Sequence, residues 1–222
     1  MKVPSAPMKK VTVLKVQARN KNRVNVYLDG EFAFGLVMIE AAKLHLGQVL
    51  SDADIERIKK SDESEMAFEK AVKFISYRPR SEKEVRQNLK KKEIEAGLID
   101  EAVQRLKRVG LLNDEQFAQM WVESRSHSKP KGRRALKIEL RQKGLSREAV
   151  EAAVAGTNDE EVARRLAASR APRLKKLPKI EFRRKLGSYL ARRGINYEII
   201  SEVVEHAWQE FGEGNDTLEN ED

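Results

Sequence analysis

The sequence predicts a mainly α-helical protein in which three tandem three-helix repeats form an elongated array behind a small N-terminal β-hairpin or sheet module. Three observations lead to this prediction. Apolar residues alternate on both sides of an Asp-Gly pair near the start, the apolar spacing becomes helical from about residue 63, and one helical pattern then recurs along the chain.

The first 36 residues read as strands. Val24, Val26 and Leu28 alternate strictly with polar residues, and Asp29-Gly30 separates them from Phe32 and Phe34. Asp-Gly between alternating apolar runs is the strongest short-range hairpin signal, because a type I′ turn needs a positive φ at both central residues. A short helix is expected from about residue 37 to 44. Another should begin at Ser51, with Asp54 completing a capping box.

From residue 63 onward the spacing is that of amphipathic helices. Phe68, Ala71, Val72 and Ile75 occupy one helical face. Helix starts are expected where a capping residue stands three positions before an acid or amide, and the pairs are Ser81 with Glu84, Asn113 with Gln116, and Asn158 with Glu161.

A glycine followed by an apolar residue recurs at Gly97, Gly144 and Gly194, with spacings of 47 and 50 residues. Anchoring the repeat on these glycines requires a three-residue insertion in the first unit. Each unit then reads as helix, basic helix, glycine turn and helix. One such unit buries little surface alone, so neighbouring units are expected to stack.

These patterns divide the chain into five segments. They are the β-hairpin module with short helices (1–62), three-helix repeat 1 (63–112), repeat 2 (113–156), repeat 3 (157–211) and a disordered acidic tail (212–222).

The net charge is +9, and it is unevenly spread. Residues 129–211 hold 20 lysines and arginines against 11 acids, whereas residues 212–222 hold five acids and no base. A basic field of this kind attracts polyanions, of which nucleic acid is the first candidate. A solvated basic surface without a ligand is the alternative.

Several classes of function are excluded or disfavoured. The chain has no cysteine, and its three histidines lie far apart. Phosphate loops, dinucleotide fingerprints, nucleophile elbows and zinc-protease motifs are absent from the sequence. We therefore expect no catalytic residue, no metal and no cofactor. With no signal peptide or membrane span in the sequence, we expect a cytoplasmic protein.

The second helices of repeats 2 and 3 carry the candidate binding residues. Arg133-Arg134 aligns with Arg183-Arg184, and Lys129 aligns with Lys179. Arginine on a rigid helix suits phosphate contacts. The predicted nucleic-acid or filament-binding residues are Lys129, Lys131, Arg133, Arg134, Lys137, Arg141, Lys179, Arg183, Arg184, Arg192 and Arg193.

Other interpretations of these residues remain open. Trp121 and Tyr77 have the chemistry to stack on bases, although their spacing favours core packing. Three-helix units with a basic helix also suggest helix-turn-helix DNA readers, but no single recognition helix is marked.

Four segments resemble the RecX family of RecA recombinase regulators. They are Gly110 to Arg125, Lys131 to Ser146, Arg78 to Leu89 and the Leu28-Asp-Gly-Glu-Phe32 hairpin. The resemblance extends over about residues 10–211. It implies three tandem three-helix repeats in a curved, elongated shape, no catalytic residues and no required cofactor.

The resemblance also implies a function and partners. Members of that family bind RecA and its filament on single-stranded DNA, inhibit ATP hydrolysis, strand exchange and coprotease activity, and in some cases bind DNA directly. We therefore expect a monomeric regulator that binds RecA, its nucleoprotein filament and single-stranded DNA, and no membrane. A general DNA-binding helical-repeat protein and an interaction scaffold are the alternatives.

Overall fold

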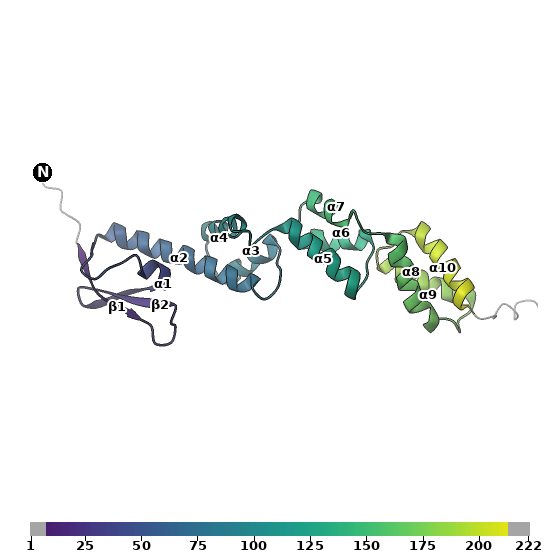
Figure 1. Cartoon of the computed structure of the whole chain (residues 1–222), viewed down its shortest axis with the longest axis horizontal. Coiled ribbons are helices and arrows are strands. Elements are labelled where there is room, and N and C mark those ends of the chain that lie inside the picture. The colour runs from purple at the N-terminus through teal and green to yellow at the C-terminus, as the bar shows by residue number, and fades with distance from the viewer. Residues whose placement is uncertain (1–7, 213–222) are drawn as a thin grey trace, which may run out of the picture. The chain divides into compact units, whose positions relative to one another are not determined.

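The computed structural model describes residues 8–212, which divide into two compact units between Leu112 and Asn113 (Figure 1). The first unit holds a four-stranded antiparallel sheet and one three-helix repeat. The second holds two further three-helix repeats. The predicted mainly helical fold, with three repeats and an N-terminal sheet module, is confirmed.

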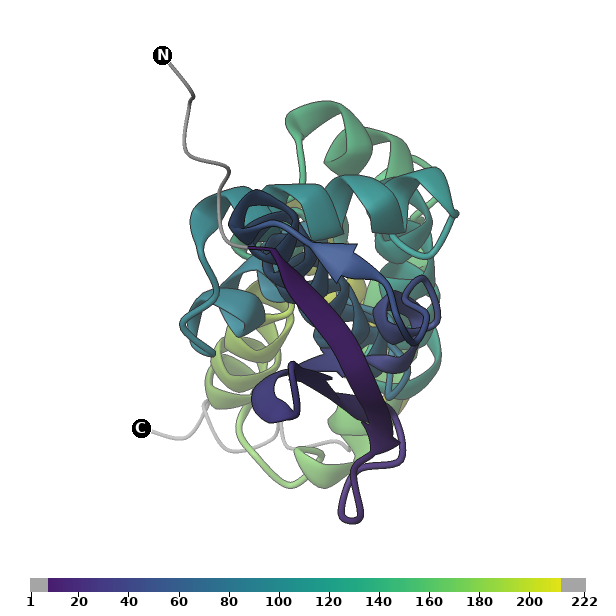
Figure 2. The ribbon, with the colours of Figure 1, turned by 90° about the vertical axis from the view of Figure 1, so that its left-hand side faces the viewer.

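The sheet has the strand order β3-β2-β1-β4, and its strands lie nearest the viewer in Figure 2. The strands are β1 (Lys9–Val16), β2 (Arg23–Leu28), β3 (Glu31–Val37) and β4 (Val49–Leu50). Asp29 and Gly30 join β2 to β3 with φ angles of 51° and 92°, as the predicted hairpin turn requires. The short β4, which pairs with the start of β1, was not predicted.

Two helices follow the strands, α1 (Met38–Ala41) and α2 (Asp52–Ile75). Ser51 and Asp54 form the predicted capping box at the start of α2. This helix runs without interruption through the predicted domain boundary at residues 62 and 63. The sequence pattern does not show this continuity, because the two halves of α2 contribute apolar residues to two different cores. Ile55 packs against the sheet, whereas Ala67 and Ala71 pack inside repeat 1.

Asp62 of α2 fastens the helix to the sheet. Its carboxylate accepts a hydrogen bond from the Val37 backbone N–H at 2.5 Å and one from the Arg23 guanidinium at 3.1 Å. The Asp62 side chain is 8% exposed. A buried carboxylate is stable only when it is paired and hydrogen-bonded, so these two contacts set the position of α2 against β3.

The three repeats share one plan. Repeat 1 consists of the second half of α2 with α3 (Glu82–Lys90) and α4 (Ala96–Arg108). Repeat 2 consists of α5 (Asp114–Ser128), α6 (Arg133–Gln142) and α7 (Arg147–Val154). Repeat 3 consists of α8 (Asp159–Arg170), a 3-10 turn (Ala171–Arg173), α9 (Lys179–Arg192) and α10 (Tyr197–Phe211).

The predicted caps are confirmed at the start of α3, α5 and α8. Ser81 and Glu84 form a capping box, and the side chains of Asn113 and Asn158 accept backbone N–H groups of the first turn. Each repeat has its own apolar core, so the cores follow one another along the sequence.

The glycine-anchored register predicted for repeat 1 is wrong. Gly97 lies in the first turn of α4 and does not terminate α3. Glu93 follows α3 and adopts a left-handed conformation, with a φ of 58°. Gly144 and Gly194, with φ angles of 89° and 85°, stand at the same place in repeats 2 and 3. In all three repeats the residue that follows this left-handed position (Ile94, Leu145 or Ile195) donates its N–H to the carbonyl of the leucine five positions earlier. No insertion is needed, and the repeat spacings are 51 and 50 residues.

The prediction of a disordered tail over 212–222 falls mainly on residues 213–222, which lie outside the described residues.

Candidate nucleic-acid interface

A hollow of about 590 Å³ lies between repeats 2 and 3, and four of the predicted binding residues line it. One wall is α6, with Arg133, Arg134, Lys137, Ile138 and Arg141. The opposite wall is formed by the starts of α8 (Asn158 to Glu160) and α10 (Asn196 and Ile199). We call this site the inter-repeat hollow. Four cations face it, against the two carboxylates of Asp159 and Glu160.

Close backbone contact between repeats 2 and 3 fixes the shape of this hollow. The N–H of Gly132 donates to the Arg193 carbonyl at 2.8 Å, and the N–H of Arg133 donates to the buried Asp159 carboxylate at 2.7 Å. A Cβ on Gly194 would lie 2.5 Å from the backbone nitrogen of Ala135. A side chain at residue 194 would therefore force the start of α6 away from the turn that precedes α10.

A second hollow, of about 460 Å³, lies between α9 and α10. We call it the repeat-3 hollow. The α9 residues that line it are Arg183, Arg184, Gly187, Ser188 and Ala191, and the α10 residues include Tyr197 and Ile200. All five α9 residues stand 50 positions after the five α6 residues of the inter-repeat hollow. The same face of the second helix therefore lines a hollow in both repeats.

The first turn of α10 separates the two hollows. Asn196 and Ile199 line the inter-repeat hollow, whereas Tyr197 and Ile200 line the repeat-3 hollow. Asn196 caps this helix without a side-chain hydrogen bond to its first turn. Unpaired N–H groups at the start of a helix favour anions, which adds to the positive field of the arginines around them.

Several of the predicted binding residues are neutralised by carboxylates within their own repeats. Lys137 contacts Glu151 at 2.5 Å, and Arg141 lies 3.9 Å from the same carboxylate. The hydrogen bond from Lys137 is the main reason why the pKa of Glu151 lies below its usual value. Both Arg183 and Lys179 pair with Glu205 on α10. These cations offer a ligand less charge than the sequence suggests.

Four predicted residues are exposed and have no partner among residues 8–212, namely Lys129, Arg134, Arg184 and Arg192. Arg134 and Arg184 occupy equivalent positions of repeats 2 and 3. Arg134 lines the inter-repeat hollow, and Arg184 lines the repeat-3 hollow. An exposed arginine without a carboxylate partner keeps its full charge and all its donors for a phosphate. These two residues are therefore the most available cations of the two hollows.

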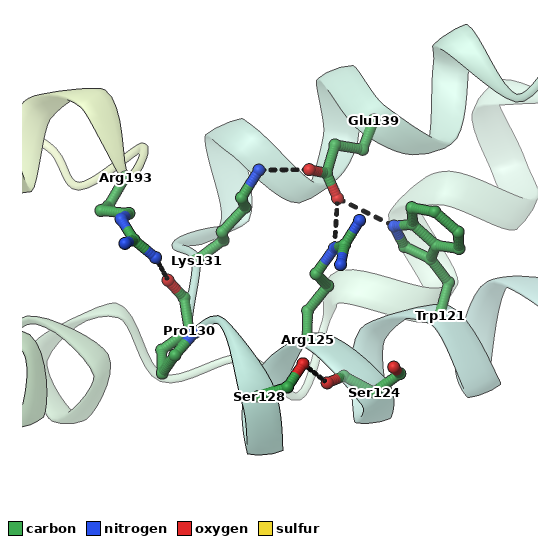
Figure 3. Close-up of polar contacts among 8 residues, drawn as sticks. All are labelled: Trp121, Ser124, Arg125, Ser128, Pro130, Lys131, Glu139 and Arg193. Atoms are coloured by element: carbon green, nitrogen blue, oxygen red, sulfur yellow. Dashed lines mark hydrogen bonds and ion pairs between the residues drawn. The ribbon is translucent and has the colours of Figure 1, made fainter.

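Lys131 and Arg193 have structural partners near the hollows (Figure 3). Lys131 pairs with Glu139, which also accepts hydrogen bonds from Trp121 Nε1 and Arg125 Nε at 2.9 Å each. Arg193 donates to the Pro130 carbonyl at 3.3 Å and stacks over Tyr189. Contact of either residue with nucleic acid stays a prediction.

The carboxylate of Glu139 ties α5 to α6 inside repeat 2. Burial by itself raises the pKa of this carboxyl, but hydrogen bonds from Lys131, Arg125 and Trp121 outweigh it and hold the pKa below its usual value. Trp121 also lies against Phe117, with ring centroids 5.7 Å apart. This tryptophan is thus held by the core of repeat 2.

Repeat 1 reproduces the basic face only in part, because Lys83, Arg86 and Lys90 stand where repeat 2 has Arg134, Lys137 and Arg141. In the corrected register Glu82 stands where repeats 2 and 3 have Arg133 and Arg183. Glu82 pairs with Arg86 and Lys107, and Arg86 also pairs with Asp100. The charges of α3 are thus largely satisfied within repeat 1.

Neither a metal site nor a membrane span was found in the part of the chain that the structure describes. Residues 8–212 bring no three histidine or acidic side chains together in a way that could hold a metal ion. No helix among them is long and apolar enough to cross a bilayer.

Four family models match the chain in order along its length. They are the regulatory protein RecX N-terminal domain (residues 9–51) and the first (67–106), second (113–154) and third (158–204) three-helix domains of RecX. The chain belongs to the RecX family. Each RecX domain falls inside one of the segments predicted from the sequence, whose boundaries themselves stay a prediction.

Relatives and a solved structure agree with this membership. The chain is 34% identical over 207 residues to the regulatory protein RecX of Listeria monocytogenes, an alignment that covers 91% of this chain and 77% of the relative. It is 33% identical over 200 residues to regulatory protein RecX of Bacillus subtilis, covering 88% and 76%. A crystal structure of regulatory protein RecX, 23% identical, superposes with a TM-score of 0.74 over 89% of this chain and 99% of that one, which supports the fold.

One aromatic residue that lines the repeat-3 hollow was missed by the sequence reasoning. Tyr197 is 82% exposed, more than Tyr77 at 72%. The sequence analysis considered Tyr77 and Trp121 because their rings can stack on bases, but only the structure shows which aromatic residue stands beside the arginines. The sequence does offer a signal for Tyr197. This residue comes directly after the cap of a helix that follows a basic helix.

Proposed function

We propose that this chain is a regulator of RecA recombinase that binds RecA and its filaments on single-stranded DNA. Its main effect is to inhibit ATP hydrolysis, strand exchange and coprotease activity. The observation that carries the proposal is the ordered match of four RecX domains between residues 9 and 204.

The charge distribution supports a polyanionic target. Arg134 and Arg184 are exposed without a partner in the described chain, and each lines a hollow large enough for a phosphate group and its neighbours. A recombinase filament on single-stranded DNA presents phosphates along its length, and arginine binds phosphate with two parallel hydrogen bonds.

The proposed mode of action is binding rather than catalysis. The relatives are named regulatory proteins, and the sequence contains none of the enzyme motifs considered above. We propose that the chain acts as a cytoplasmic monomer without a cofactor, and that it changes RecA activity by occupying the filament.

Co-sedimentation with RecA filaments tests the proposal. RecA is assembled on long single-stranded DNA, the chain is added, and the filaments are pelleted. The comparison is a pellet of naked DNA at the same nucleotide concentration. We expect more of the chain in the filament pellet than in the DNA pellet. Equal amounts in both pellets would contradict binding to RecA.

The alternative is a general DNA-binding helical-repeat protein without a recombinase partner. The basic hollows favour it as much as they favour a filament, because phosphate contacts carry no information about a recombinase. In that case the chain would bind naked DNA and leave the RecA ATPase rate unchanged at concentrations that do not strip RecA from the DNA.

A further inference from the structure

We propose that Tyr197 stacks on an unpaired base whose flanking phosphates bind Arg134 and Arg184. The inference rests on the proposed function for its choice of a single DNA strand as the ligand. It adds a specific site, formed by the two hollows and the first turn of α10 between them.

Tyr197 is open to solvent. Tyr197 is the first residue of α10, and the residue as a whole is 82% exposed. Its ring makes no aromatic or cation–π contact among the described residues. A tyrosine ring offers a flat apolar face that loses little conformational entropy on binding, and every nucleobase has a complementary face.

An arginine lies on either side of the first turn of α10 that carries Tyr197. Arg184 lines the same hollow as Tyr197, whereas Arg134 lines the inter-repeat hollow beyond Asn196. Neither arginine has a partner in residues 8–212. The two are equivalent positions of successive repeats, so the repeat itself places one free guanidinium on each side of the first turn of α10.

Most of the carboxylates near this surface already have a cationic partner. Asp159 accepts a hydrogen bond from the Arg133 N–H and lies 3.9 Å from the Arg133 guanidinium, and Glu205 pairs with Arg183 and Lys179. Glu160 lies 3.7 Å from Arg164, and Glu198 is exposed in the first turn of α10. Most of the nearby carboxylates are therefore already neutralised, and the free arginines dominate the local field.

An unpaired strand fits this arrangement better than a duplex. In a duplex the faces of the bases are already stacked on each other, so a single exposed ring gains nothing from them. A phosphate on each side of one base gives two ionic contacts and one stacking contact. An acidic helix of a protein would satisfy the arginines but would give Tyr197 no flat partner.

The experiment measures binding of a labelled oligo(dT) of about 16 nucleotides, a length within the range that one single-strand site covers. The variants are Tyr197→Leu, Tyr197→Phe and the pair Arg134→Gln/Arg184→Gln. The controls are Tyr77→Leu, another strongly exposed tyrosine, and Arg108→Gln/Arg173→Gln, which removes the same charge at two exposed arginines outside both hollows. All variants are checked for an unchanged melting temperature.

Tyr197→Leu should weaken oligo(dT) binding by about 5- to 100-fold and keep the salt dependence, because stacking is not ionic. Tyr197→Phe and Tyr77→Leu should bind like the wild type. The hollow arginine pair should flatten the log–log salt slope by about 1.4, and more than the control pair does. Binding to a hairpin duplex should not respond to Tyr197→Leu.

Wild-type affinity of Tyr197→Leu, or equal loss in Tyr197→Phe and Tyr197→Leu, would overturn the stacking role. Equal slopes in the two arginine pairs would overturn the assignment of the hollows, and loss of duplex binding in Tyr197→Leu would overturn the preference for a single strand. RecA ATPase, measured separately, distinguishes this failure from failure of the proposed function. If the variants and the wild type inhibited RecA equally and bound oligo(dT) equally, the proposed site would be rejected. The proposed function as a RecA regulator would still stand.

Discussion

At the scale of single residues, the decisive property of the basic side chains is whether a carboxylate already holds them. The sequence places Arg133, Arg134, Lys137 and Arg141 on one helix, and in the structure these four line one hollow, whereas their binding role stays a prediction. It does not show that Glu151 and Glu205 neutralise several of the predicted cations, since these acids lie on the next helix of each repeat. Only packing reveals that Arg134 and Arg184 have no partner among residues 8–212.

Glu139 gives a residue-scale prediction about stability. Glu139→Gln should lower the free energy of unfolding by about 1 to 2 kcal/mol at neutral pH, because Lys131 and Arg125 lose their shared carboxylate. The measurement is urea denaturation, with Glu123→Gln on the exposed side of α5 as the control. A loss no greater than that of the control would contradict a stabilising role of the network.

The same residue predicts a pH dependence. The pKa of Glu139 is lower in the folded protein than in the unfolded chain, so the unfolded chain binds more protons as the pH falls. The contribution of Glu139 is complete above about pH 5 and is lost as the pH falls through the lowered pKa. The difference between wild type and Glu139→Gln should therefore shrink as the pH falls below about 5. A constant difference over this window would show that the charge does not matter.

At the scale of helices and turns, the capping signals in the sequence were reliable, whereas the repeat register was not. Ser51, Ser81, Asn113 and Asn158 all cap the helices they were expected to cap, because a cap depends on residues within one turn. The register of repeat 1 failed because Glu93 adopts the left-handed conformation that glycine adopts in the other repeats.

Glu93→Gly should stabilise the protein by about 0.5 to 1 kcal/mol, because glycine adopts a positive φ without the strain that a Cβ causes. The matched change Gly144→Ala should destabilise it by about 1 kcal/mol. Thermal denaturation of both variants is the measurement. Destabilisation by Glu93→Gly would contradict the corrected register.

Asp62 gives a second prediction at this scale. Asp62→Ala should cost about 2 to 4 kcal/mol, because the Val37 N–H and the Arg23 guanidinium both lose their acceptor. Asp62→Asn keeps an acceptor for Val37 and should cost less, and Glu63→Ala on the exposed side of α2 is the control. If Asp62→Ala melted like the control, α2 would not depend on this contact with the sheet.

At the scale of the whole molecule, charge is separated between a basic body and an acidic end. Residues 1–211 carry a net charge of +14, and residues 212–222 carry −5. Attached carboxylates compete with phosphate for the same cations, most strongly at low salt. Deleting residues 213–222 should therefore tighten single-strand binding at low ionic strength and leave the melting temperature unchanged. Equal affinities of the full and shortened chains at low salt would reject this competition.

We propose that the chain regulates RecA and uses Arg134 and Arg184 to hold the DNA strand. The most direct measurement is the rate of ATP hydrolysis by RecA on single-stranded DNA, titrated with wild type, Arg134→Gln/Arg184→Gln and the control pair Arg108→Gln/Arg173→Gln. We predict that wild type and control pair inhibit at the same concentration, and that the hollow pair needs at least about five times more. An unchanged ATPase rate at every concentration of the wild type would contradict the account.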